Sequence, residues 1–192
     1  RIRSNSINLD SLPVIKSVQS IYLSQAEIAG RLSLIDNPIN RVIISSSTIL
    51  DSLFLGPTAT IDNIEYSGPF PMSDEQQAFN TAPLFRKLTN GGSLSAYNIY
   101  SLNGLEHLEW LNNVTIIRAE FTDLSSVENL RTNRLYFERV ILPEDYCPLY
   151  ALVSSAAEAN DLWWALNSAS STDVLSKCTE TLQVCEGDVV IS

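Results

Sequence analysis

The stretch LEHLEWLNNVTI, which runs from Leu105 to Ile116, has an apolar residue at every third position and closes on an apolar-x-apolar triplet. The triplet, Val114-x-Ile116, puts two side chains on one side of an extended chain, because successive residues of a strand point to opposite faces. The stretch therefore predicts a short strand with one inward face, preceded by a return segment that packs on the same core.

The pattern apolar-x-x-apolar-x-apolar recurs along the chain at a nearly constant spacing. Its central apolar residues are Ile21, Val42, Ile64, Leu94, Val114 and Leu135, so that successive copies are 21, 22, 30, 20 and 21 residues apart. A unit of about 21 residues cannot bury such a face alone, and the copies must stack. We therefore predict a repeat solenoid with a parallel β-sheet. The side chains expected in its core are Ile21, Leu23, Val42, Ile44, Ile64, Val114, Ile116, Leu135 and Phe137.

The longer copies, Leu12–Leu23, Phe85–Ala96 and Leu105–Ile116, resemble the LxxLxxLxxLxL consensus of leucine-rich repeats. The segment Phe121–Leu130 is similar to the connecting segment of short bacterial surface repeats. The resemblance covers residues 12–140 and implies a module of a cell-surface or secreted protein.

The chain departs from that family five residues after each central apolar residue, where leucine-rich repeats usually place an asparagine. The residues found there are Ala26, Ser47, Pro69, Ile99, Ala119 and Val140. Turns without an asparagine ladder must close differently, which favours the receptor L-domain type, a relative that coils as a right-handed β-helix. The alternative is an ordinary α/β or all-β domain whose strands happen to be evenly spaced.

We assign residues 1–140 to the solenoid, with an insertion at about 67–90. Glycine and proline interrupt the strand pattern in this insertion, and Ser73 with Gln76 fits a capping box that opens one short helix. We interpret it as a tolerated surface insertion, and the alternative is a loop that projects into a binding site.

We assign residues 141–192 to a helical C-terminal cap in the same structural domain. From Pro148 to about residue 167 the apolar residues, Trp163 among them, follow a helical period. A terminal unit has to cover the open end of a solenoid core, and this helix is expected to do so. Residues 189–191 are a candidate edge strand or the start of a linker.

The charge of the chain argues against nucleic acid as a partner. Twelve basic and twenty-two acidic side chains give a formal net charge of −10, whereas nucleic-acid binding depends on clustered Lys and Arg. No run of about 18 apolar residues is present, so membrane insertion by this segment is not expected. The chain opens on Arg-Ile-Arg-Ser without a Met, and we interpret it as part of a longer chain.

Three cysteines lie in the last quarter of the chain, at Cys147, Cys178 and Cys185. Their spacing matches neither a zinc site nor a redox motif. We expect Cys147 to form a disulfide with Cys178 or with Cys185, the former preferred, which would place the chain outside the reducing cytosol. The alternative is three buried, reduced thiols in a cytosolic protein.

The sequence carries little catalytic chemistry. Its single histidine, His107, has no recognisable partner for nucleophilic catalysis, and we interpret it as an exposed polar spacer. Metal-ligand spacings and phosphate-binding loops are absent, so neither a metal nor another cofactor is expected. Glu65 and Glu138 are expected three strands apart, at roughly 14 Å, too far for a glycosidase pair. We therefore predict that the chain is not an enzyme.

Between the inward residues of each strand lie side chains that face outward. Exposed Tyr beside Ser and Thr suits the recognition of protein or sugar, through apolar ring faces with hydrogen-bonding edges. The candidate ligand-binding residues on this surface are Tyr22, Ile43, Ser95, Tyr97, Thr115, Tyr136 and Glu138. The alternative is that these side chains only pack against one another. Asn113 begins an Asn-x-Thr acceptor sequence and is a candidate glycosylation site on the same surface.

These observations predict a non-catalytic recognition or adhesion module that binds a protein or carbohydrate ligand through its sheet. The expected location is extracellular, at a cell surface or in a periplasm. A structural spacer of a larger surface protein, without its own ligand, is the alternative. A carbohydrate-active β-helix enzyme is the third reading, by analogy of fold alone.

Overall fold

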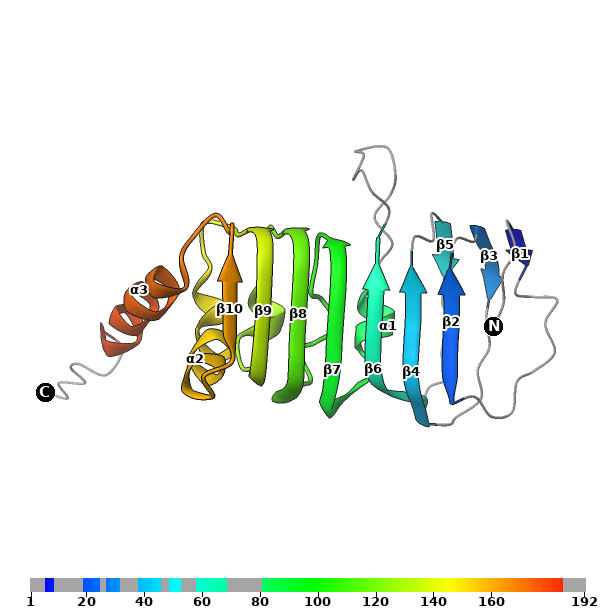
Figure 1. The fold of residues 1–192 in the computed structure, drawn as a ribbon, viewed down its shortest axis with the longest axis horizontal. Coiled ribbons are helices and arrows are strands. Elements are labelled where there is room, and N and C mark those ends of the chain that lie inside the picture. Colours follow the sequence, from blue (N-terminus) through cyan, green and yellow to red (C-terminus); the bar gives the residue numbers. More distant parts are fainter. Residues whose placement is uncertain are drawn as a thin grey trace, which may run out of the picture.

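The computed structural model describes residues 6–8, 19–24, 27–31, 38–45, 49–52, 58–68 and 81–184. Its main element is a seven-stranded sheet with the order β10-β9-β8-β7-β6-β4-β2, in which every pairing is parallel. The strands are β2 (Ser20–Ser24), β4 (Pro38–Ser45), β6 (Thr60–Ser67), β7 (Leu88–Ile99), β8 (Trp110–Glu120), β9 (Arg131–Ile141) and β10 (Leu162–Ala165). They stand side by side in one row, as Figure 1 shows.

A second parallel sheet joins β1 (Ser6–Asn8), β3 (Glu27–Arg31) and β5 (Ile49–Ser52) in the order β1-β3-β5. The helices are α1 (Ala82–Phe85), α2 (Tyr150–Glu158) and α3 (Ser171–Val184), with 3-10 turns at η2 (Ser125–Val127) and η3 (Cys147–Leu149). Among the residues described, none of the helices is both long and apolar enough to cross a membrane.

The register of the main sheet confirms the predicted solenoid. The central apolar residues pair in sequence, Ile21 with Val42, Val42 with Ile64, and so on through Leu94 and Val114 to Leu135. All nine residues expected in the core are buried. The repeat spacing thus sets one turn of a parallel β-solenoid, and β2 and β4 are neighbours as expected.

The return segments complete the core. Every third residue on the approach to β8 is buried, at Leu102, Leu105 and Leu108, and Leu111 continues this spacing inside the strand. The residues Phe121, Leu124, Val127 and Leu130, which precede β9, are buried as well. The backbone closes these segments with local turns, such as the bonds from Leu105 N to Leu102 O and from Leu108 N to Leu105 O. The spacing of three therefore reflects successive tight turns that each return a leucine to the same core.

A row of left-handed residues replaces the missing asparagine ladder. Asn98, Arg118, Arg139 and Leu166 have φ between 54° and 57°. The first three lie side by side, because the residues on either side of them pair across β7, β8 and β9, and Leu166 directly follows β10. Each strand changes direction at this level, so that the next residue points inward again. Ile99, Ala119 and Val140, which occupy positions where an asparagine would stand, are accordingly core residues.

The last part of the chain differs from the single helix predicted for residues 148–167. Helix α2 ends at Glu158, Asn160 adopts a left-handed backbone, and Leu162–Ala165 form β10 against β9. Trp163 and Trp164 therefore lie on opposite faces of a strand. The apolar spacing was ambiguous here, because Leu162 and Trp164 also have the alternation of a strand.

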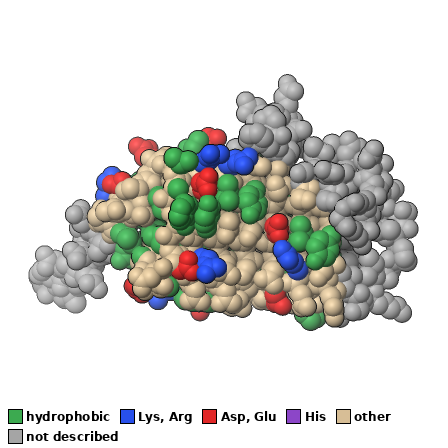
Figure 2. All heavy atoms as spheres, in the orientation of Figure 1, with side chains coloured by type: hydrophobic (Ala, Val, Ile, Leu, Met, Phe, Trp, Pro, Cys, Tyr) green, Lys and Arg blue, Asp and Glu red, His purple; other side chains and the backbone are tan. Residues whose placement is uncertain are grey.

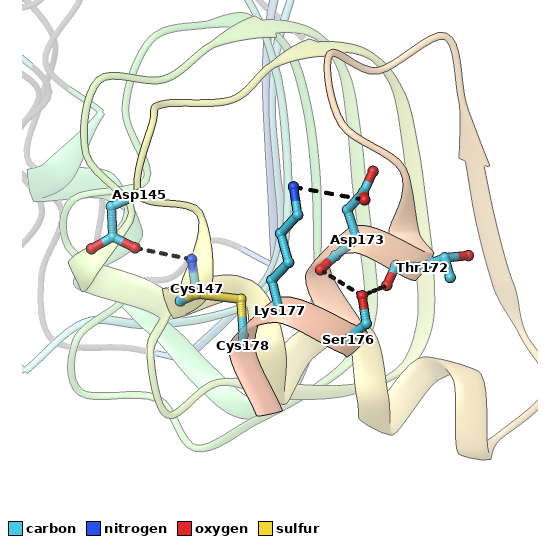
Figure 3. The surroundings of a disulfide bond; sticks show 7 residues. All are labelled: Asp145, Cys147, Thr172, Asp173, Ser176, Lys177 and Cys178. Carbon is cyan, nitrogen blue, oxygen red and sulfur yellow. Dashed lines mark hydrogen bonds and ion pairs between the residues drawn. A yellow bond between two sulfur atoms is a disulfide. The ribbon is translucent and has the colours of Figure 1, made fainter. Parts of the chain in front are cut away.

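Helices lie at this end of the solenoid, and a disulfide joins two of their segments. Helix α2 packs on β9, and α3 packs on α2 and η3. Cys147 in η3 is bonded to Cys178 in α3, with their Cα atoms 5.2 Å apart (Figure 3). This is the preferred pairing of the sequence prediction. Cys185, residues 189–191 and the capping box at Ser73 and Gln76 lie outside the described residues.

Candidate binding face of the sheet

Two rows of side chains on the outward face of the main sheet hold the candidate ligand-binding residues. Along each strand these outward residues alternate with inward ones such as Val114 and Ile116. The outward residues of neighbouring strands pair in register and so form the rows. In register, the middle row is Tyr22, Ile43, Glu65, Ser95, Thr115, Tyr136 and Trp163. The next row toward the ends of the strands is Ser45, Ser67, Tyr97, Ile117, Glu138 and Ala165.

The larger apolar group on this face consists of Tyr97, Ile117, Tyr136 and Trp163, which we call the aromatic patch. The first three are half-buried, whereas Trp163 is 55% exposed. The rings of Tyr136 and Trp163 are nearly parallel, with centroids 5.7 Å apart and planes inclined by 5°. Figure 2 shows hydrophobic side chains gathered over this half of the sheet.

The patch has a carboxylate at its border. The Tyr136 hydroxyl donates a hydrogen bond of 2.6 Å to Glu138 Oε2. This bond raises the pKa of Tyr136, because the carboxylate accepts the phenolic proton and opposes a second negative charge. The guanidinium of Arg139 lies 3.7 Å from the other oxygen of Glu138. Glu138 is thus an acceptor held in place beside the rings.

A polar row flanks the patch on its other side. Arg134 Nε lies 2.6 Å from Asp161 Oδ2, and both side chains are substantially exposed. Asn113 donates to the hydroxyl of Ser93 at 3.1 Å and is half-buried. Its glycosylation remains a prediction, and the side chain lies in the row next to Thr115.

The predicted site residues fall into two groups rather than one. Tyr97, Thr115, Tyr136 and Glu138 lie on β7, β8 and β9 at the aromatic patch, with Ser95 beside them. Tyr22 and Ile43 lie on β2 and β4, on the far side of β6, where Arg41 bonds to Glu65 at 2.9 Å.

Sequence reasoning missed Trp163, the most exposed aromatic of the patch. It was assigned to a helix, although Asn160-Asp161 before it is a sequence pair typical of a helix end. The tandem tryptophans then divide between the two faces. Trp164 stacks on Phe137 with ring centroids 5.1 Å apart and donates from Nε1 to Ala169 O.

The described part of the chain offers few groups for catalysis. Within it, no three His, Cys, Asp or Glu side chains lie close enough to hold a metal ion. Glu65 on β6 and Glu138 on β9 are separated by β7 and β8, a separation of roughly 14 Å at the usual strand spacing. His107, which is exposed, donates from Nε2 to Leu88 O at 2.9 Å.

Comparison with protein-family models found no match, and comparisons with curated proteins and with solved structures found none either.

Proposed function

We propose that this chain is a non-catalytic recognition module and that the ligand of its sheet face is a carbohydrate. The observation that carries the proposal is Trp163. One face of its ring stacks on Tyr136. Trp163 lies on β10, the last strand of the sheet. An indole presented in this way offers an apolar face, on which the C–H face of a sugar ring can stack.

The polar groups around the patch suit the hydroxyl groups of the same sugar. Glu138 is an acceptor, the Arg134–Asp161 pair supplies donors and acceptors, and Thr115 adds a hydroxyl in the middle row. Sites that bind small polar ligands combine apolar surface with a few fixed polar groups in this way. A protein ligand is the rival, because Tyr and Trp also anchor protein interfaces.

The proposed location is extracellular, at a cell surface or in a periplasm. It is supported by the Cys147–Cys178 bond, because disulfides persist mainly in oxidising compartments. The resemblance to leucine-rich repeats and receptor L-domains points to the same location. No catalytic role is proposed.

The test is a glycan array, followed by titration of any bound glycan against the protein and three variants. Trp163→Ala and Tyr97→Ala should each weaken binding by about ten-fold or more, as the removal of a central aromatic anchor does. Tyr22→Ala is the matched control, because Tyr22 is an exposed tyrosine on the same face but lies on β2. Its affinity should stay within about two-fold of the unmodified protein.

The opposite results separate the rival functions. A glycan that binds equally well to all three variants would move the site away from the patch. If no glycan on the array binds, and if Trp163→Ala abolishes binding of a defined protein partner, the ligand of the sheet face is a protein and not a carbohydrate. The absence of both ligands would favour a structural spacer.

A further inference from the structure

A hollow of about 360 Å³ lies at the opposite end of the strands from the left-handed row, where β6 and β7 begin. Arg86, Lys87 and His107 line it, together with the polar side chains of Thr60, Thr89 and Asn90. Its described lining includes no acidic residue. In a chain with 22 acidic and 12 basic side chains, a lining that groups basic residues without an acidic one is unusual.

The hollow arises from an irregularity in β7. Between two successive pairs of the register, β6 advances by two residues, from Ile61 to Asn63, whereas β7 advances by five, from Leu88 to Ser93. Strand β7 therefore has three extra residues at this point, which form a bulge. Gly92 is required there, because a Cβ at this position would collide with the carbonyl oxygen of Asp62. The bulge carries Thr89 and Asn90 to the wall of the hollow.

Hydrogen bonds fix the walls. Ile61 N donates to Lys87 O at 2.6 Å, and His107 Nε2 donates to Leu88 O at 2.9 Å. Asn90 Oδ1 accepts from the backbone N–H groups of Glu109 and Trp110 at 3.0 and 3.1 Å. Because its oxygen is engaged by the protein, the amide N–H₂ of Asn90 is the part left to donate to a ligand.

Two carboxylates beside lining residues, those of Glu106 and Asp62, accept hydrogen bonds within the protein. Both oxygens of Glu106 accept the N–H of Gly104 at 2.9 Å, a bond that lowers the pKa of Glu106 with help from the charges of Arg86 and His107. Asp62 Oδ1 accepts the hydroxyl of Thr89 at 3.0 Å. Neither carboxylate lines the hollow.

We propose that this hollow binds an oxyanion group, phosphate or sulfate, carried by a molecule about the size of a monosaccharide. The guanidinium of Arg86 and the ammonium of Lys87, two consecutive residues of the lining, can make charge-assisted hydrogen bonds to such a group. The amide of Asn90 and the hydroxyl of Thr60 supply neutral polar partners for the rest of the ligand. A volume of about 360 Å³ exceeds what a bare phosphate fills and lies within the range of small-molecule sites.

The test is a titration followed by nuclear magnetic resonance of backbone amides, with four probes. These are glucose 6-phosphate, glucose 6-sulfate, inorganic phosphate, and glucose as the neutral control. The two esters should shift the amides of Thr89, Asn90 and Leu108 saturably, with inorganic phosphate weaker and glucose without effect. The stronger ester identifies which oxyanion the hollow prefers.

Variants distinguish a specific binding site from a general attraction of the anionic probes to exposed cationic side chains. Arg86→Gln combined with Lys87→Gln should weaken ester binding by about ten-fold, because it removes the charge-assisted bonds. Arg131→Gln is the matched control: Arg131 is an exposed arginine at the start of β9, and its loss should change the affinity by less than about two-fold.

Unsaturable shifts, equal shifts with glucose, or equal losses in the double variant and in Arg131→Gln would each overturn the proposal. Because the hollow and the aromatic patch use different residues, these outcomes are independent of the carbohydrate site on the sheet face.

Discussion

Trp163 and Trp164 are neighbours in sequence, but they stack on opposite faces of the sheet, Trp163 on Tyr136 outside and Trp164 on Phe137 inside. The inner ring also donates a hydrogen bond of 2.7 Å to Ala169 O. The pair thus divides two roles that tryptophan can have, exposed contact surface and core packing.

The two tryptophans should therefore contribute unequally to stability. Trp164→Ala is expected to lower the free energy of unfolding by roughly 3 kcal/mol, because it opens a cavity against Phe137 and strands the carbonyl of Ala169. Trp163→Ala should lower it by about 1 kcal/mol, the contribution of one exposed aromatic pair. Urea unfolding of both variants measures this difference. Equal losses would contradict the assignment of Trp163 to an outward surface.

The Cys147–Cys178 bond should stabilise the C-terminal helices on the solenoid. The two cysteines are 31 residues apart in sequence, and a loop of that length predicts a loss of roughly 3–4 kcal/mol when the bond is removed. We expect this loss in Cys147→Ala combined with Cys178→Ala, measured by urea unfolding without reductant.

Two controls accompany that measurement. Reductant should destabilise the unmodified protein to the level of the double variant and leave the double variant unchanged. Cys185→Ala should retain the full stability in the absence of reductant. A loss with Cys185→Ala as large as with the double variant would show that Cys185 takes part in the bond in solution.

The sequence predicted the solenoid because its evidence is repeated. Each copy of the strand pattern is weak, but residues such as Val42 and Val114 recur at a spacing that only stacking explains. The inward and outward faces then follow from the alternation of a strand. The turn chemistry was harder, since arginine and leucine hold left-handed positions at Arg118 and Leu166 that usually favour Gly or Asn.

The parts that escaped prediction depend on contacts between distant residues. Strand β10 forms because β9 offers an open edge to Leu162–Ala165, a tertiary effect that the helical spacing of the apolar residues concealed. The hollow joins Arg86 and Lys87 with His107, about one repeat further along the chain. That spacing of 20 or 21 residues was the sequence signal that these side chains lie on neighbouring turns. The bulge in β7 that shapes the hollow is not evident from Gly91-Gly92 alone.

Leu166 should be a position where glycine is more stable than leucine. Its φ is 57° and its side chain is 73% exposed, so the backbone is strained and little packing compensates. Leu166→Gly is expected to raise the free energy of unfolding by about 1 kcal/mol. Leu166→Ala is the control, since alanine keeps the Cβ that causes the strain, and it should give no gain. A gain with alanine equal to that with glycine would attribute the effect to the exposed leucine side chain.

Tyr66 should make the fold sensitive to alkaline pH. Burial raises its pKa from 10.0 to about 12, because the phenolate would lose its hydration in the core, where the side chain is 4% exposed. The folded state therefore holds this proton more tightly than the unfolded chain. The corresponding stability is fully present below pH 10 and is lost as the pH rises toward 12. A shift of this size corresponds to roughly 3 kcal/mol across that window.

We expect Tyr66→Phe to unfold at a distinctly higher pH than the unmodified protein, as followed by circular dichroism between pH 8 and about 12.5. Tyr22→Phe, which changes a tyrosine that is 44% exposed, should unfold at the same pH as the unmodified protein. If both variants shifted the alkaline transition equally, the loss of stability would come from tyrosine ionisation in general and not from the buried phenol.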